Sequence, residues 1–279
     1  MKCEWDKFLS ILPGSIRRDV DRLGRSSLQE LRIRQGKPVQ LVLRNESLFL
    51  QEIGTTDLMN AIINTASRYS PWAAETISDG FLTAAGGHRI GICGEAVVRG
   101  GAVSGIRNPT SICIRVARDF PGIAGNAAHL FGNVLILGPP GAGKTTLLRD
   151  LIRQISNTCK GSVAVVDERG ELFPIGSDFD TGASTDVLTG CRKPQGVDMA
   201  LKTMGPAVIA VDEITSEADC EAVRQALWCG VRVIATAHAF GKKDLLKRNV
   251  YRKLTEPGLF DALLTLRQDK SWIVERMAV

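Results

Sequence analysis

The chain has 279 residues, of which 44% are hydrophobic, so it is long enough to bury the cores of two small domains. Its net charge of +5, from 35 Lys and Arg against 30 Asp and Glu, is too small to indicate a nucleic-acid or membrane partner. Seven scattered cysteines without zinc-site spacing, and no stretch approaching the ~20 apolar residues that span a bilayer, predict a cytoplasmic protein without zinc.

The first 125 residues are predicted to form the smaller domain, with an α+β fold. Residues 8–23 have helical spacing with a Pro-Gly break, and residues 28–53 alternate as two or three short strands around a Gly-Lys-Pro turn. Residues 55–70 open with Thr-Thr-Asp capping chemistry and continue as a helix. Residues 81–117 are predicted as a glycine-punctuated antiparallel meander followed by a short strand.

From residue 126 to residue 279 the pattern changes to apolar strands alternating with helices, which predicts a second domain. Continuous apolar strands with polar ends are typical of a parallel sheet covered by helices on both faces. We therefore predict an α/β fold of the phosphate-loop NTPase type, RecA-like or AAA-like. A helix is expected over residues 242–254 and a terminal hairpin over residues 260–278. The apolar strands are expected at residues 133–138, 163–168, 208–213 and 231–238.

The stretch GPPGAGKT matches the phosphate-loop pattern G-x-x-x-x-G-K-[ST], after a strand and at the start of a helix. Its glycines let the backbone N–H groups turn toward phosphate oxygens, and the helix N-terminus adds a positive dipole. Lys144 is expected to reach the β- and γ-phosphates of ATP, and Thr145 to ligate Mg²⁺. The predicted nucleotide-binding residues are Gly138, Pro139, Pro140, Gly141, Ala142, Gly143, Lys144, Thr145 and Thr146.

Two later strands each end in an acid pair, Asp167-Glu168 and Asp212-Glu213. Magnesium needs a second carboxylate near Thr145, and a glutamate is needed to activate the attacking water. Both pairs are expected at the same sheet edge as the loop, which suits a ligand crevice.

A third strand ends in Thr236 and His238, again on the crevice side. A histidine at this position can sense the γ-phosphate by hydrogen bonding. The candidate catalytic residues are therefore Glu168, Glu213 and His238.

The order of these motifs resembles that of phosphate-loop ATPases with an extra strand beside the loop strand. In that group the late strands lie nearest the loop, which implies that Asp212 is the metal-side carboxylate, together with Thr145. The resemblance leaves the base open. In ring ATPases of the AAA type the base follows the metal aspartate, as Glu213 does, whereas in RecA-like ATPases it ends the neighbouring strand, as Glu168 does.

More specifically, GPPGAGKT, VVDERGEL, VIAVDEI and ATAHA resemble the four boxes of the hexameric secretion ATPases of type II and type IV systems and type IV pili. The stretches GGHRIGICGE and IRVAR make the chain similar to a narrower family, that of stage III sporulation protein AA of endospore-forming bacteria. One departure is Asp212-Glu213, where secretion ATPases usually carry Gly-Glu.

This resemblance implies a Mg-dependent ATP hydrolase that assembles as a homo-oligomer, a hexamer. It also implies a motor in the mother cell that energises the channel to the forespore, held at the membrane by membrane-embedded channel proteins. Ring ATPases complete their sites with an arginine from a neighbour. The candidates for that role are Arg115, Arg118, Arg169 and Arg232.

Two other functions remain open from the sequence. A nucleic-acid-dependent ATPase is compatible with the basic stretch over residues 242–253, but only Tyr251 in that stretch offers an aromatic ring for stacking on bases, so nucleic acid is not the favoured partner. A scaffold that binds ATP with little turnover is disfavoured because both acid pairs are intact.

Overall fold

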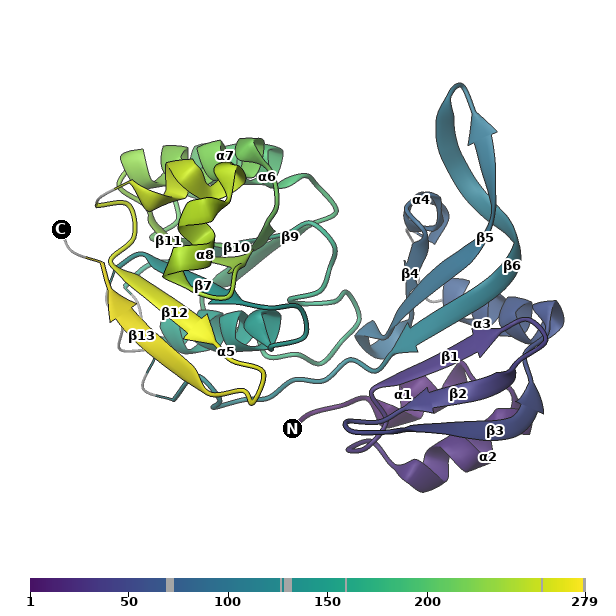
Figure 1. Cartoon of the computed structure of the whole chain (residues 1–279). Coiled ribbons are helices and arrows are strands. Elements are labelled where there is room, and N and C mark those ends of the chain that lie inside the picture. The colour runs from purple at the N-terminus through teal and green to yellow at the C-terminus, as the bar shows by residue number, and fades with distance from the viewer. Residues whose placement is uncertain (69–72, 126, 128–131, 159, 257, 278–279) are drawn as a thin grey trace. The chain divides into compact units, whose positions relative to one another are not determined.

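The computed structural model describes the whole chain except residues 69–72, 126, 128–131, 159, 257 and 278–279 (Figure 1). The chain forms two compact units. The N-terminal unit comprises Met1–Asp119 together with Pro174–Asp178, and the C-terminal unit comprises Phe120–Phe173 and Phe179–Val279. The chain therefore leaves the C-terminal unit once, contributes one short segment to the N-terminal unit, and returns.

The N-terminal unit is built on a six-stranded antiparallel sheet in the order β3-β2-β1-β6-β5-β4. Its strands are β1 (Glu30–Arg34), β2 (Pro38–Val42), β3 (Ser47–Ile53), β4 (Phe81–Thr83), β5 (Arg89–Arg99) and β6 (Ala102–Arg115). Its helices are α1 (Trp5–Ser10), α2 (Gly14–Leu23), α3 (Thr56–Ser67), α4 (Ala73–Ser78) and the short 3₁₀ helix η1 (Ala85–Gly87).

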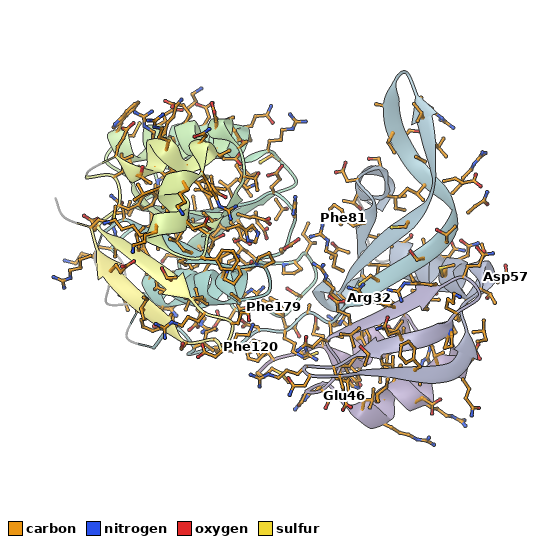
Figure 2. The ribbon with its side chains drawn as sticks, in the orientation of Figure 1. Arg32, Glu46, Asp57, Phe81, Phe120 and Phe179 are labelled. Carbon is orange, nitrogen blue, oxygen red and sulfur yellow. The ribbon has the colours of Figure 1, made fainter. Side chains whose placement is uncertain are left out.

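The core of the N-terminal unit lies on one face of this sheet, because the strands alternate apolar and polar residues. Leu31 and Ile33 of β1 are fully buried, whereas Arg32 between them is half-buried on the opposite face and pairs with Glu30 at 2.7 Å (Figure 2). The buried side chains pack against Phe8 of α1 and Ile62 of α3. A one-sided core of this kind is expected for an antiparallel sheet.

The antiparallel meander predicted over residues 81–117 is formed by β4, β5 and β6, which pair in that order, and the short strand expected at its end is part of β6. Strands β5 and β6 pair past the ends of β1 and β4 and continue as a two-stranded ribbon (Figure 1). Gly94 lies inside β5 at a register shift, and a Cβ there would come 2.7 Å from the carbonyl oxygen of Arg107. The glycine therefore marks a bulge within a continuous strand.

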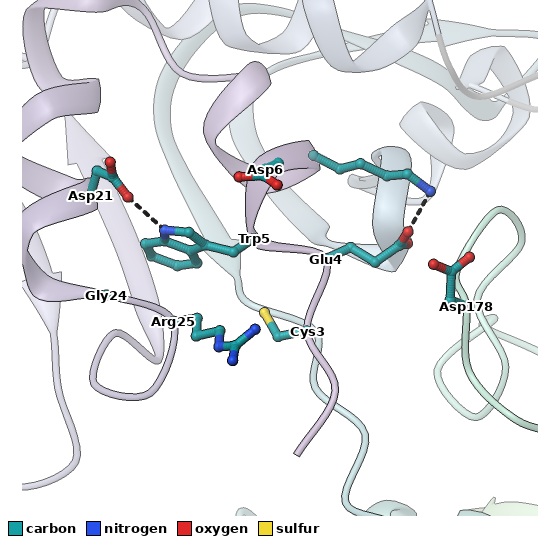
Figure 3. A pocket seen from close by; sticks show the side chains of 9 residues that line it. Cys3, Glu4, Trp5, Asp6, Asp21, Gly24, Arg25 and Asp178 are labelled. Atoms are coloured by element: carbon teal, nitrogen blue, oxygen red, sulfur yellow. Dashed lines mark hydrogen bonds and ion pairs between the residues drawn. The ribbon is translucent and has the colours of Figure 1, made fainter.

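A pocket in the N-terminal unit lies beside α1 and is lined in part by Cys3, Arg25 and Asp178 (Figure 3). Two of its acids are engaged within the unit. Trp5 Nε1 donates to Asp21 Oδ1 at 2.8 Å, and the Lys7 ammonium pairs with Glu4 at 2.5 Å. The first contact ties the N-terminal segment to α2, and the second lies within that segment.

The C-terminal unit is built on a seven-stranded sheet in the order β13-β12-β7-β11-β10-β8-β9. All neighbours are parallel except the C-terminal hairpin, which is antiparallel as predicted. The strands are β7 (Val134–Gly138), β8 (Val163–Asp167), β9 (Thr185–Thr189), β10 (Val208–Ile214), β11 (Arg232–His238), β12 (Ala262–Leu266) and β13 (Trp272–Arg276). The predicted parallel α/β fold is confirmed.

Helices cover both faces of this sheet: α5 lies on one face, and α6, α7 and α8 lie on the other (Figure 1). They are α5 (Lys144–Thr158), α6 (Lys193–Thr203), α7 (Glu217–Trp228), α8 (Lys242–Lys247) and the 3₁₀ helix η3 (Asn249–Thr255). The helix expected over residues 242–254 is thus shorter than predicted, because α8 stops at Lys247 and the chain tightens into η3. Within the described residues, no helix has the length and apolar character needed to cross a membrane.

Strand β11 lies between β7 and β10, so an extra strand separates the phosphate-loop strand from the strand that ends in Asp212-Glu213. Strand β8 with the other acid pair lies one place further out. Because these strands are parallel, their carboxyl ends meet at one sheet edge. The loop, both acid pairs and His238 are therefore brought to the same edge.

Candidate nucleotide-binding and catalytic site

The phosphate loop runs from the carboxyl end of β7 to the start of α5, and its glycines are required by its geometry. Gly141 and Gly143 have φ of 72° and 101°, a conformation that side chains disfavour. A Cβ at Gly138 would lie 3.2 Å from the Cβ of Ala142. The apex is a turn in which Ala142 N donates to Pro139 O at 3.2 Å. Gly143, Lys144, Thr145 and Thr146 follow at the N-terminus of α5.

Lys144 is almost fully buried, and its ammonium has three partners. It donates to Gly138 O at 3.0 Å and Pro139 O at 3.1 Å, and it lies 3.0 Å from His238 Nδ1. Burial lowers the pKa of Lys144, whereas Asp212 and Glu213 act to raise it. The ammonium is therefore held at the mouth of the loop.

His238 joins Lys144 to Glu213. An ammonium can only donate, so Nδ1 of His238 accepts, and the ring proton is then on Nε2. That Nε2 lies 2.9 Å from Glu213 Oε1 and donates to it. The result is a continuous chain of hydrogen bonds from the loop lysine through His238 to a carboxylate.

Asp212 is held by two hydroxyl groups. Thr145 Oγ1 donates to Asp212 Oδ2 at 2.8 Å, and Thr236 Oγ1 donates to Asp212 Oδ1 at 2.6 Å. Threonine hydroxyl and carboxylate oxygens are hard donors of the kind that Mg²⁺ prefers. The pair that the sequence assigned to the metal is therefore in contact, and its chemistry fits that ion.

Glu213 has an unusual backbone. Its φ is 54°, and the pairing of β10 with β11 shifts between Val211 and Ile214. Its N–H donates to Thr236 Oγ1 at 2.7 Å, and its second carboxylate oxygen lies 3.4 Å from Arg169 Nη1. A non-glycine residue in this left-handed conformation is strained, and such strain is concentrated at functional sites.

The other acid pair has different partners. Asp167 is 2% exposed and accepts backbone N–H bonds from Glu171, Leu172 and Phe173 at 2.9–3.0 Å. Burial nevertheless raises its pKa to about 6. Asp167 thus closes the turn that follows β8. Glu168 forms an ion pair with the ammonium of Lys193 at the start of α6.

The four candidate arginines lie in different surroundings. Arg169 reaches Glu213, as described above. Arg232 begins β11 at the strand end opposite His238 and donates to Gly132 O at 3.4 Å. In the N-terminal unit, Arg115 is exposed and lies 3.4 Å from Glu30, whereas Arg118 is half-buried and donates to the carbonyls of Arg25 and Leu28.

Three basic residues of the C-terminal unit were missed by sequence reasoning. Lys193 pairs with Glu168, and the Lys270 ammonium donates to Gly141 O at the loop apex. Arg149 of α5 donates to the carbonyls of Glu171 and Leu172, and its guanidinium lies 4.6 Å from the ring of Phe179 (Figure 2). No motif marks them, because tertiary pairing rather than sequence spacing brings them to these positions.

The basic stretch over residues 242–253 offers little to nucleic acid. Tyr251 is 5% exposed and donates its hydroxyl to Ile214 O at 3.0 Å, so its ring is part of the core. Arg248 pairs with Asp244 at 3.1 Å. The one aromatic side chain of the stretch is therefore not available for stacking on bases.

Comparison with known proteins identifies relatives over nearly the whole chain. The model of the family described as "Sporulation stage III, protein AA" matches residues 3–273. Stage III sporulation protein AA of Bacillus subtilis (strain 168) is 36% identical over 285 residues, covering 95% of this chain and 92% of its own.

Solved structures of two ATPases share the fold. The ATPase DotB of Legionella pneumophila has a TM-score of 0.60 at 18% identity, covering 95% of this chain and 80% of its own. The pilus retraction motor PilT, solved with bound ADP, has a TM-score of 0.61 at 15% identity, covering 91% of this chain and 77% of its own. At these identities the likeness concerns the fold.

Proposed function

The chain belongs to the family of sporulation stage III protein AA, and from that premise we propose that it is a Mg-dependent ATP hydrolase that works as a secretion-ATPase-like motor. The observation that carries this proposal is the 2.8 Å contact between Thr145 of the phosphate loop and Asp212 of β10. It joins the two elements that every phosphate-loop hydrolase needs, a phosphate cradle and a metal-side carboxylate.

The loop supplies substrate binding. The backbone N–H groups at the start of α5 and the dipole of this 15-residue helix favour the phosphates of ATP. Lys144, held at the loop mouth by Gly138 O, Pro139 O and His238, binds the β- and γ-phosphates. Thr145 and Asp212 are the residues that hold Mg²⁺, which when bound neutralises charge on the phosphate oxygens.

Glu213 is the general base in this proposal. Its carboxylate is oriented by the Nε2–H of His238 on one oxygen and by Arg169 on the other. It accepts the proton of the water that attacks the γ-phosphate, and ADP and phosphate are the products. The strained backbone at Glu213 supports this choice, because a charged residue is kept in a conformation that glycine would adopt more easily.

Glu168 is the alternative base, and its contacts support a positioning role instead. Its carboxylate is paired with Lys193, whose side chain is 8% exposed. Within the described residues, Glu168 makes no contact with the loop lysine or His238, whereas Glu213 is linked to Lys144 through His238. The pair joins the end of β8 to the start of α6 and stiffens this side of the site.

The motor assembles as a homo-oligomer, a hexamer, in which a neighbour contributes an arginine to each site. Arg115 suits this role better than the other three candidates, because its side chain is 62% exposed, whereas Arg169 contacts Glu213 of its own chain. In the sporulating mother cell the motor energises the channel to the forespore through membrane-embedded channel proteins. Family membership supports the role in sporulation.

Steady-state ATP hydrolysis of wild type, Glu213→Gln and Glu168→Gln, with and without Mg²⁺, tests the enzymatic part. Each protein is also assayed for ATP binding, because glutamine keeps the size of glutamate but removes the base. We expect Glu213→Gln alone to bind ATP without turning it over. Loss of turnover in Glu168→Gln alone would assign the base to the outer strand, and turnover that is independent of Mg²⁺ would contradict the metal assignment.

Light scattering in the presence of Mg-ATP tests the assembly. A mass near six chains is expected at micromolar concentration. A protein that stays monomeric at every workable concentration would contradict the ring.

A further inference from the structure

The β12–β13 hairpin lies against the phosphate loop on the side away from His238. Strand β12 pairs in parallel with β7, with Thr265 opposite Leu137. The next residue, Leu266, therefore meets Gly138, where a Cβ would lie 3.3 Å from the Leu266 carbonyl oxygen. The hairpin turn over residues 267–271 follows directly and reaches the loop apex.

Lys270 of this turn contacts the loop at its apex. Its ammonium donates to Gly141 O, and its Cδ passes near Gly143, at 4.0 Å from the place where a Cβ on that glycine would be. The N–H of the same peptide, that of Ala142, donates to Pro139 O at 3.2 Å. Both polar groups of the 141–142 peptide are therefore held, one within the loop and one by the hairpin.

The backbone of Lys270 is strained in the way that Glu213 is. Among the described residues, positive φ values outside glycine occur at Asn108, Glu213 and Lys270. Asparagine tolerates this conformation, whereas glutamate and lysine do not. The turn that holds Lys270 at φ 72° is closed by Asp269, which accepts the Ser271 N–H at 2.9 Å. Of these two charged residues, Lys270 contacts the loop directly, and Glu213 is linked to the loop lysine through His238.

We infer that Lys270 is a positioning residue for the phosphate loop. Its ammonium holds the apex carbonyl of Gly141 outward, away from the phosphates, and so keeps the following amides in the cradle arrangement. The inference rests on the proposed ATP-binding function. A positioning role and a direct contact with the γ-phosphate predict different affinities. A loop held in place by Lys270 favours ATP and ADP equally, since both carry the phosphates that the cradle binds, whereas a γ-phosphate contact would favour ATP alone.

The test measures the dissociation constants of Mg-ATP and Mg-ADP by calorimetry for the full chain, three Lys270 variants and one control variant. The melting temperature of each protein is measured in the absence of nucleotide. Lys270→Met removes the donor, and Lys270→Gly removes the donor and also relieves the backbone strain. Lys270→Arg keeps a donor. Lys202→Met is the control, because Lys202 is an exposed lysine on α6 that pairs with Asp198.

We expect Lys270→Met and Lys270→Gly to weaken ATP and ADP alike by about tenfold, as for the loss of one charge-assisted hydrogen bond. Turnover of bound ATP stays within about twofold of wild type. Lys270→Gly melts about 2–4 °C higher than Lys270→Met, because glycine fits φ 72°. Arginine restores most of the affinity, and the control binds as wild type does.

Unchanged affinity in Lys270→Met would overturn the inference, as would a loss confined to ATP, which would indicate a direct γ-phosphate contact. If the nucleotide affinity falls only in those variants whose melting temperature also falls, Lys270 has a structural role alone. Wild-type protein that binds neither nucleotide would overturn the proposed function itself, and this inference with it.

Discussion

Each unit contains a histidine next to the end of a strand: His88 precedes β5, and His238 ends β11. His88 contacts backbone groups, whereas His238 contacts charged side chains. His88 of the N-terminal unit is fully buried. Its Nδ1 accepts the Ala117 N–H at 3.1 Å, and its Nε2 lies 3.1 Å from Glu4 O. His238 of the C-terminal unit is 30% exposed at its side chain and contacts Lys144 and Glu213.

We propose that this difference separates a structural histidine, His88, from a functional one, His238. The backbone partners of His88 fix one tautomer and hold the ring in the core. The charged partners of His238 are groups of the kind that change partners or protonation during a reaction. Burial lowers the pKa of His88 to about 4, so that ring stays neutral at physiological pH. We therefore expect changes in the N-terminal unit to alter stability, and changes at the C-terminal sheet edge to alter turnover.

The largest effect is expected from Glu213→Gln. Removing a general base slows the chemical step by about 10²–10⁴-fold, while the amide keeps the volume and a hydrogen bond to His238. Stopped-flow or steady-state phosphate release measures the loss, and thermal melting measures stability. A variant that unfolds several degrees earlier at unchanged turnover would show that Glu213 belongs with His88 among structural groups.

The second effect concerns His88→Ala, which is expected to destabilise the chain by about 3 kcal/mol. The substitution leaves the Ala117 N–H without its partner, removes the second contact of the Glu4 carbonyl, and opens a cavity beside Phe8, whose ring centroid lies 5.1 Å from that of the imidazole. Urea denaturation measures the loss. Turnover per folded molecule should stay within about twofold, and a larger fall would mean that this histidine also serves the site.

The third effect is the pH dependence that His88 confers. Its pKa is about 4 in the folded chain and about 6.5 when unfolded. The unfolded state therefore binds the extra proton first, and the stability present above pH 6.5 is lost as the pH falls toward 4, by roughly 3 kcal/mol. His88→Gln has no imidazole to titrate, so its stability should lack this slope. An identical slope in the variant would assign the acid sensitivity to other groups.

Local motifs made much of the site predictable. The loop pattern, the acid pairs and the strand ending in His238 are each encoded within a few residues, and one sheet edge collects them because parallel strands end together. The sequence did not show the strained backbone of Glu213, which depends on the register of β10 against β11. It also did not show which glutamate meets the histidine.

What escaped prediction has a common physical cause. Lys193 and Lys270 reach the site through the packing of α6 and the pairing of β12 with β7, and no spacing rule encodes such contacts. The bulge at Gly94 in β5 was not predicted either, because it depends on the register of β5 against β6. The parallel sheet of the C-terminal unit was easier to predict from the sequence, since its strands consist of continuous apolar runs.

The fourth effect comes from His238→Asn, the counterpart of the change at His88. Asparagine has no group in the place of the histidine Nε2, so the chain of hydrogen bonds from Lys144 to Glu213 is interrupted. We expect turnover to fall about 10- to 100-fold and the free energy of unfolding to change by less than about 0.5 kcal/mol, because a half-exposed side chain contributes little to the core. A stability loss like that of His88→Ala would remove the contrast between the two histidines.

The smallest effects are expected when one helix cap is removed from each unit. Thr55 Oγ1 accepts the Leu58 N–H at 3.1 Å at the start of α3, and Ser216 Oγ accepts the Asp219 N–H at 3.1 Å at the start of α7. Alanine at either position should lower stability by about 1 kcal/mol.

Only Ser216→Ala should also slow turnover, by about two- to threefold. Ser216 lies three residues after Glu213, and its cap anchors the strand end whose strained backbone aims that carboxylate. Thr55 caps a helix of the other unit and anchors no residue of the site. Melting temperatures and ATP turnover of the two variants measure both quantities. Equal slowing in Thr55→Ala would show that the rigidity of the N-terminal unit limits the reaction as much as the geometry at Glu213 does.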